Sequence, residues 1–279
     1  MKKHLLLSFA LICISAVSLT QTYDEYQQKI SECFSKKDYR CAEENLKACI
    51  DLVGEDFGNL YLLYSNLGTA QRRLDKKEEA LASYNKAIEL KNSPDVLSNR
   101  ATLRRQMNDP EGALEDFNLA HTLAPKDNSI LINRSVLKEE MGDTLSAEND
   151  LKAVLESDPN DFRALTNLTN IRVRRREYDL ALSTYNKLIN DTPGEPILYN
   201  NRADVYLKMK EYSKAMSDVD MAIKLGPAYG NALITKAEIQ IATGDRKKAL
   251  KNLQKAVKLG ENSDYVFHLI DECNKYLGN

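Results

Sequence analysis

The 279-residue chain has no tryptophan and only three histidines. His4 lies in the N-terminal apolar segment, and His121 and His268 are far apart, so no Cys/His or His/Glu group has the spacing of a metal site. A glycine-rich phosphate loop and a nucleophile elbow are also missing. We therefore expect neither catalysis nor a bound metal or cofactor.

A large excess of charge of one sign is missing too. The formal net charge is −2, from 39 lysines and arginines against 41 acids. Removal of residues 1–20 would take away two lysines and no acid, which leaves 37 bases against 41 acids and a net charge of −4. Nucleic acid is therefore a poor candidate partner, because its binding depends on the neutralisation of phosphates.

The chain has only one long hydrophobic run, Leu5–Val17, which follows Lys2 and Lys3. Thirteen residues are too few to span a bilayer comfortably. The pattern predicts a secretory signal peptide over residues 1–20, with cleavage before Gln21. We expect an exported protein, periplasmic or extracellular, from a bacterium. The alternative is an uncleaved membrane anchor, and a membrane association of any other kind would need an envelope partner.

Strand patterns and low-complexity tracts are absent, but repetition is pronounced. Alanines recur every 33 or 34 residues at Ala80, Ala113, Ala147, Ala181, Ala215 and Ala249. A small or hydroxyl residue precedes each by twelve positions, and a large one, usually apolar, follows each by four. A proline follows four of them by twelve positions and cannot continue a helix interior. Such a period indicates a helical solenoid.

These slots resemble those of the tetratricopeptide repeat. The resemblance implies an all-α protein, a right-handed superhelix of helix pairs. We expect about seven repeats over residues 21–262, the first degenerate, and a C-terminal capping helix over 263–279. Within the repeats, turns such as Gly142-Asp143 and Gly244-Asp245 predict that the aspartate caps the second helix. Asp271 replaces the small residue of the slot, so no further repeat can stack there.

Arginine and aspartate occur together in three repeats. Where a repeat has the arginine, an aspartate follows sixteen residues later, and where leucine replaces the arginine, serine or threonine replaces the aspartate. We predict structural ion pairs between the two helices of a repeat, namely Arg100–Asp116, Arg134–Asp150 and Arg202–Asp218. A row of arginines that binds acidic ligands is the less favoured interpretation.

Asparagine also recurs, at Asn66, Asn99, Asn133, Asn167 and Asn201. We call these five residues the asparagine ladder. Each lies two residues before a small slot, about 200° around the first helix, so it should point away from the partner helix into a concave groove. A side-chain amide can donate to a peptide C=O and accept from a peptide N–H. The ladder therefore predicts a site for an extended peptide, and contacts between adjacent helices are the alternative.

The ladder is similar to the asparagines of the repeat array of O-linked N-acetylglucosamine transferase, which hold extended substrates. The resemblance implies peptide binding at the same five positions, without transfer. It does not extend to the first and last repeats, where Gln28 and Thr235 occupy the slot. Groove positions are basic toward the N-terminal half and acidic at Asp204 and Glu238, which favours a partner that is acidic first and basic later.

We accordingly expect a scaffold whose partner is a protein or an extended peptide segment. The competing interpretation is an architectural subunit of an envelope complex that uses its convex face or its ends. A carrier of glycan fragments is less favoured, because the tyrosines mostly occupy packing slots.

The cysteines could form one disulfide. Cys33 and Cys41 should face each other across the turn of the first helix pair, and an exported protein can keep such a bond. The alternative is that all the cysteines outside the signal peptide are reduced and buried.

Overall fold

The computed structural model describes residues 22–278, all of whose regular structure is helical. The predicted all-α class is confirmed. The predicted signal peptide lies outside the described residues. The chain divides after Asp150 into two compact units, of which the structure describes residues 22–150 and 151–278.

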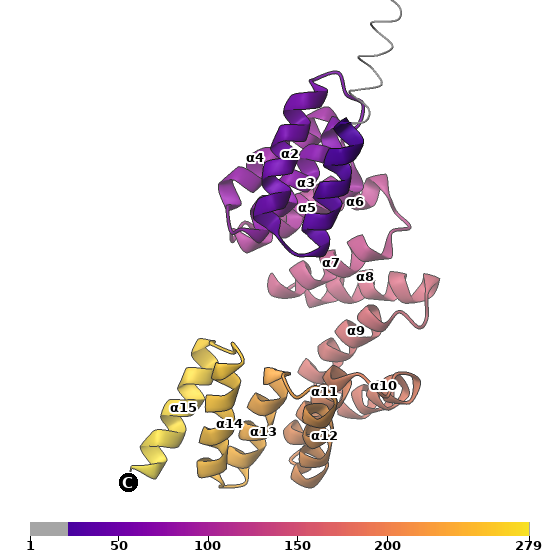
Figure 1. Cartoon of the computed structure of the whole chain (residues 1–279). Coiled ribbons are helices and arrows are strands. Elements are labelled where there is room, and N and C mark those ends of the chain that lie inside the picture. Colours follow the sequence, from indigo (N-terminus) through magenta and orange to yellow (C-terminus); the bar gives the residue numbers. More distant parts are fainter. Residues whose placement is uncertain (1–21, 279) are drawn as a thin grey trace, which may run out of the picture. The chain divides into compact units, whose positions relative to one another are not determined.

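A helix over residues 22–35 comes first. The next seven helices are α2 Tyr39–Val53, α3 Leu60–Arg73, α4 Lys77–Leu90, α5 Pro94–Gln106, α6 Pro110–Leu123, α7 Asn128–Glu140 and α8 Thr144–Ser157 (Figure 1). The unit boundary falls within α8. The second unit continues with α9 Phe162–Arg174, α10 Tyr178–Asp191, α11 Pro196–Lys208, α12 Tyr212–Leu225, α13 Gly230–Ala242, α14 Arg246–Lys258 and α15 Asp264–Leu277.

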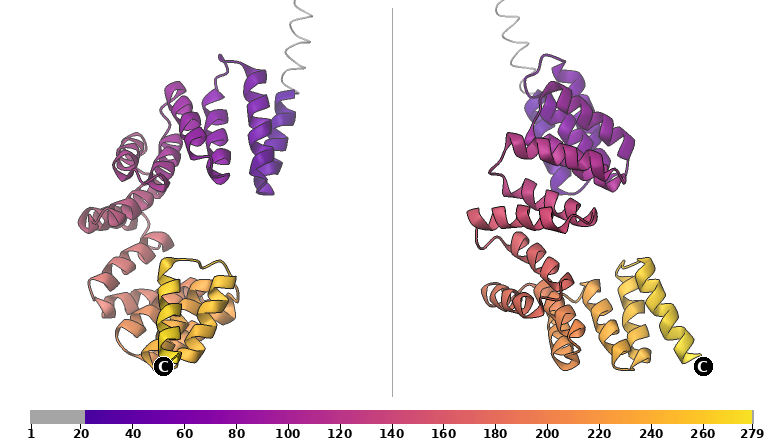
Figure 2. Two further views of the ribbon diagram at one scale, coloured as in Figure 1. Left: turned by 90° about the vertical axis from the view of Figure 1, so that its left-hand side faces the viewer. Right: turned by 180° about the vertical axis from the view of Figure 1, so that it is seen from behind.

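Within each unit, consecutive helices pack side by side in antiparallel pairs (Figure 2). The alanine of each register position is fully buried. The closest approach is at Gly68 of α3, where an added Cβ would lie 2.9 Å from the ring of Tyr84 and 3.1 Å from the carbonyl oxygen of Ala80. A small residue is therefore needed in this slot, as the repeat predicts.

The turn inside each repeat is equally regular. One residue with positive φ precedes the start of each second helix: Lys37, Asp75, Asn108, Gly142, Arg176, Lys210 and Gly244. In three of these turns the next residue is the aspartate predicted to cap the second helix. Asp109, Asp143 and Asp245 each accept a hydrogen bond from the backbone N–H three residues later, at 3.0, 3.1 and 3.3 Å. These caps satisfy donors that a helix start leaves unpaired.

The structure brings the three predicted ion pairs together. Arg100 donates from Nε and Nη2 to the two oxygens of Asp116 at 2.9 and 2.6 Å. The same bidentate geometry joins Arg134 to Asp150 at 2.9 and 2.7 Å and Arg202 to Asp218 at 2.7 and 2.7 Å. All three aspartates are buried. The pairs therefore tie the first helix of a repeat to its second, which is a structural role.

Each arginine also reaches the preceding repeat, which the sequence pattern did not predict. Nη1 donates to the side-chain oxygen of an asparagine on the previous second helix, from Arg100 to Asn85 at 2.7 Å and from Arg134 to Asn118 at 3.0 Å. Arg202 bonds Asn186 in the same way at 2.7 Å. The arginines consequently link three helices and two repeats.

In the last repeat a lysine, instead of an arginine, makes the bond to the preceding repeat. Lys236 pairs with Asp220 of the preceding repeat at 2.6 Å. Asn252, sixteen residues after Lys236, donates to Gln240 at 2.8 Å. A partner twelve residues earlier recurs elsewhere, as in Ser83 with Gln71 at 2.7 Å.

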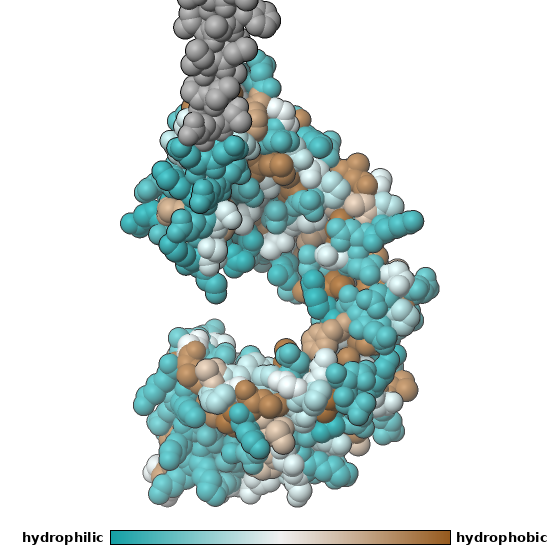
Figure 3. All heavy atoms as spheres, turned by 45° about the vertical axis from the view of Figure 1, so that its right-hand side comes forward, coloured by the Kyte–Doolittle hydropathy of each residue, from teal (hydrophilic) through white to brown (hydrophobic). Residues whose placement is uncertain are grey.

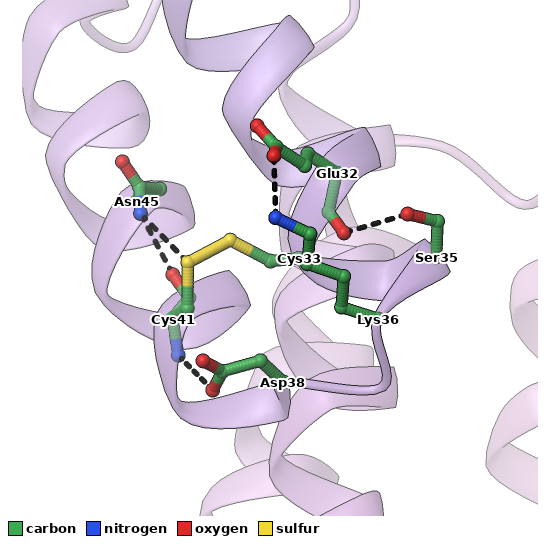
Figure 4. The surroundings of a disulfide bond; sticks show 7 residues. All are labelled: Glu32, Cys33, Ser35, Lys36, Asp38, Cys41 and Asn45. Atoms are coloured by element: carbon green, nitrogen blue, oxygen red, sulfur yellow. Dashed lines mark hydrogen bonds and ion pairs between the residues drawn. A yellow bond between two sulfur atoms is a disulfide. The ribbon is translucent and has the colours of Figure 1, made fainter.

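The structure joins Cys33 and Cys41 in a disulfide that links the helix over residues 22–35 to α2 (Figure 4). Cys33 is buried and Cys41 is half-buried. Asn45 donates to the backbone oxygen of Cys41 at 2.8 Å. The other two described cysteines, Cys49 and Cys273, are buried free thiols.

Replacement of both disulfide cysteines by serine should destabilise the first helix pair by about 2–3 kcal/mol, because the bond closes a short loop of sequence separation 8. In an array of repeats the effect should stay local. Hydrogen–deuterium exchange should rise in residues 22–53 and stay unchanged in residues 151–278. Equal exchange in the first helix pair of the variant and the oxidised parent would show that the bond contributes nothing there.

Candidate functional site

The asparagine ladder lies on the first helix of each repeat. Asn66 of α3, Asn99 of α5 and Asn133 of α7 belong to the first unit, and Asn167 of α9 and Asn201 of α11 belong to the second. Asn66 is exposed and the other four are half-buried. The ladder therefore supplies separate candidate sites in the two units.

Asn66 lines a cavity of about 400 Å³ in the first unit. All the lining residues come from two first helices, residues 22–35 and α3: Gln27, Ile30, Ser31, Phe34, Asn66 and Thr69. Ile30 and Phe34 give the cavity an apolar wall beside amide and hydroxyl groups. Its lining thus combines the two kinds of group needed to hold a peptide, hydrogen-bonding partners for its backbone and an apolar surface for a side chain.

Thr69 is held in place at the edge of this cavity. Its hydroxyl donates to the backbone oxygen of Ser65 at 3.0 Å and lies 3.0 Å from the hydroxyl of the buried Tyr84. The cavity wall is therefore anchored to the core of the repeat, which fixes its geometry before any ligand binds.

Other ladder members have partners inside the chain. Burial raises the pKa of the Tyr185 phenol, the nearby Asp204 raises it further, and a hydrogen bond from Asn201 opposes both effects. The same hydroxyl donates to Asn170 at 2.8 Å. Asn133 also has a partner within the chain. Contacts between helices, the alternative explanation of the ladder, thus account for part of it.

On α11 and α13 of the second unit, a carboxylate lies three residues after the slot that Asn201 and Thr235 occupy. Asp204 of α11 pairs with Lys208, and Glu238 of α13 accepts a hydrogen bond from the hydroxyl of Tyr265. Burial raises the pKa of Glu238, the hydrogen bond from Tyr265 opposes this effect, and the charge of Asp204 raises the pKa further. This face presents mainly hydrogen-bond acceptors.

In the first unit the predicted positive character is weaker than the sequence indicates. Arg105 pairs with Glu140 of the next first helix at 2.9 Å, which neutralises its charge. Arg73 is exposed at the end of α3. On the face seen in Figure 3, hydrophilic residues cover most of each unit and hydrophobic residues form smaller patches.

The described residues include neither a candidate metal-binding group nor a candidate membrane-spanning helix. Among residues 22–278, no three histidine, cysteine, aspartate or glutamate side chains are grouped so that they could hold a metal ion. Within the same range, every helix is too short or too polar to span a bilayer.

Known proteins share this arrangement. Models described as tetratricopeptide repeat match residues 61–94, 134–196, 197–229 and 230–262. A tetratricopeptide repeat protein from Parabacteroides merdae is 30% identical with a TM-score of 0.80, covering 91% of this chain and 99% of its own. No curated protein matches the chain significantly.

More distant structures share the fold alone. Pseudomonas aeruginosa PilF is 19% identical with a TM-score of 0.60, covering 77% of this chain and 97% of its own. A chain of the APC/C hetero-tetramer Cut9–Hcn1 is 14% identical with a TM-score of 0.65, covering 84% and 48%. Since the repeat models match most of the array and the Parabacteroides protein matches along nearly its whole length, the chain belongs to the tetratricopeptide-repeat family.

Proposed function

We propose that this protein is a non-enzymatic scaffold that holds an extended segment of another protein against its first helices. The repeat fold is suited to protein interaction. The observation that carries the peptide-binding proposal is the cavity of about 400 Å³ beside the exposed Asn66. It combines an exposed amide with an apolar wall on the face where the ladder predicts binding.

The amide can recognise a peptide backbone whatever its side chains are. It donates to a C=O and accepts from an N–H, and each such bond contributes roughly 0.5–1.5 kcal/mol net. Packed helices lie about 8–10 Å apart, and an extended peptide rises about 3.3 Å per residue. Successive first helices therefore meet such a peptide at about every third residue.

Export forms part of this proposal. The apolar run Leu5–Val17 after two lysines supports a signal peptide, and the cysteine pair Cys33 and Cys41 suits an oxidising compartment. The partner would then be another periplasmic or extracellular protein.

A second candidate function is an architectural subunit that docks through its end. It is favoured by α15, on which Phe267, Tyr276 and Leu277 are 45%, 61% and 47% exposed although the helix packs on α14 through Val266, Leu269 and Cys273. The end of the array is thus less polar than a simple cap requires.

Substitution of Asn66 by alanine should weaken binding of peptides selected on the full chain from an unbiased library by roughly three- to tenfold, because one or two backbone hydrogen bonds are lost. Fluorescence anisotropy with labelled peptides measures this change. Asn92→Ala, in the exposed loop after α4, is the matched control and should leave affinity unchanged. Equal affinity of the parent and the Asn66 variant for every selected peptide would refute a peptide site at this cavity.

A further inference from the structure

Three first helices of the second unit present a repeated pair of side chains. The residue just before each ladder slot and the residue three after it are four positions apart, so they share one face of the helix. In α9 the pair is Thr166 and Asn170, and in α11 it is Asn200 and Asp204. In α13 the second member is Glu238. α11 and α13 pack on each other, which brings their faces together.

Two of these side chains have unsatisfied buried oxygens. Thr166 and Asn200 are each 8% exposed, and within residues 22–278 neither Oγ1 of Thr166 nor Oδ1 of Asn200 has a hydrogen-bond partner. A buried polar atom without a partner destabilises the folded state, and native proteins keep few of them. The same slot in two neighbouring repeats therefore carries a buried acceptor for which the described chain supplies no donor.

Charge lies one helical turn beyond these oxygens. Asp204 follows Asn200 by four residues, and Glu238 occupies the equivalent slot of the next first helix. Lys208 and the Tyr265 hydroxyl each satisfy part of this pair. Both carboxylates are half-buried, and they occupy equivalent positions on two helices that pack on each other. A bound cation would relieve their repulsion and would supply the missing donors.

We propose that the first-helix face of the second unit binds a basic extended segment, with an arginine side chain between Asp204 and Glu238 and further donors at Asn200 and Thr166. The proposal rests on the proposed peptide-binding function and names its ligand class. Arginine fits better than lysine because its five N–H donors in a planar fork can serve two carboxylates at once. Anionic membranes and nucleic acids are repelled by the same carboxylates.

The test uses the full chain and three pools of fluorescein-labelled ten-residue peptides. The pools have random flanks and a central Arg-X-X-Arg, Lys-X-X-Lys or Gln-X-X-Gln, and anisotropy is measured at 0.15 M salt. The arginine pool should bind best, and the double variant Asp204→Asn/Glu238→Gln should lower its affinity at least tenfold. The matched control is Asp179→Asn/Asp191→Asn, which makes the same charge change at exposed positions of the second helix α10 and should weaken binding less than twofold.

A second variant removes the unsatisfied acceptor without a charge change. Asn200→Leu keeps the branching at Cγ and removes the unpaired buried oxygen, so it should keep or raise the unfolding midpoint of the free protein while it weakens binding of the arginine pool at least threefold. Unchanged binding by this variant, or equal losses in the control and in Asp204→Asn/Glu238→Gln, would overturn the proposal. If only the glutamine pool binds, and Asn66→Ala abolishes that binding, the proposed arginine site is refuted but the peptide-binding function stands. Binding of no pool would refute both.

Discussion

Replacement of Asp116 by alanine should lower the free energy of unfolding by about 3 kcal/mol, because it leaves two guanidinium groups without their shared carboxylate. Asp116 is 3% exposed and accepts from Arg100, while Arg104 approaches it at 3.2 Å. Loss of one partner of a buried pair costs more than the pair contributes, since the remaining charge stays desolvated. Urea denaturation followed by circular dichroism measures the change.

The chain contains its own control for this prediction. The preceding repeat has Leu67, Gln71 and Ser83 at the three equivalent positions, where Ser83 donates to Gln71 at 2.7 Å. The triple variant Arg100→Leu/Arg104→Gln/Asp116→Ser copies this arrangement, so it should recover most of the stability that Asp116→Ala loses. A triple variant as unstable as Asp116→Ala would show that the ion pair itself, rather than the unpaired charge, determines the effect.

Truncation of Tyr84 to alanine should cost about 3–5 kcal/mol, because it empties a fully buried site between α3 and α4. The Tyr84 ring lies against Gly68, and its hydroxyl meets Thr69 at 3.0 Å. Tyr84→Phe, which removes only that hydroxyl contact, should cost about 1 kcal/mol. Both values come from thermal and urea unfolding of the full chain.

A double-mutant cycle separates close packing from simple burial. Gly68→Ala alone should destabilise the protein, since its Cβ would lie 2.9 Å from the Tyr84 ring. In the Tyr84→Ala background the same change should cost clearly less, because only the carbonyl oxygen of Ala80, at 3.1 Å, then remains close to the added Cβ. Additive effects of the two substitutions would contradict the close contact that defines this slot.

The repeat pattern predicted the helices, their small slots and their turns because each depends on local chemistry at a fixed spacing. The same holds for Arg100 and Asp116, whose joint occurrence reports a contact between two helices of known register. The bond from Arg100 to Asn85 could not be predicted in this way, since a guanidinium has several donors and the sequence does not show which one reaches the preceding repeat.

The candidate site was predicted less completely. All five ladder residues look alike in the sequence, but Asn66 is exposed beside a cavity while Asn201 interacts with Tyr185. Exposure depends on how neighbouring repeats stack, which no single slot encodes. The unsatisfied oxygen of Asn200 was equally hidden, because the satisfaction of a buried amide depends on every element around it.

Peptides should bind to the first helices, and the second helices should only support those first helices. Photo-crosslinking measures this directly, with a photoreactive residue in library-selected peptides bound to the full, oxidised chain and mass spectrometry to locate the linked residues. Crosslinks should form to the helix over residues 22–35, α3, α11 and α13. Crosslinks confined to second helices such as α4, α10 and α12, or to the exposed end of α15, would contradict it.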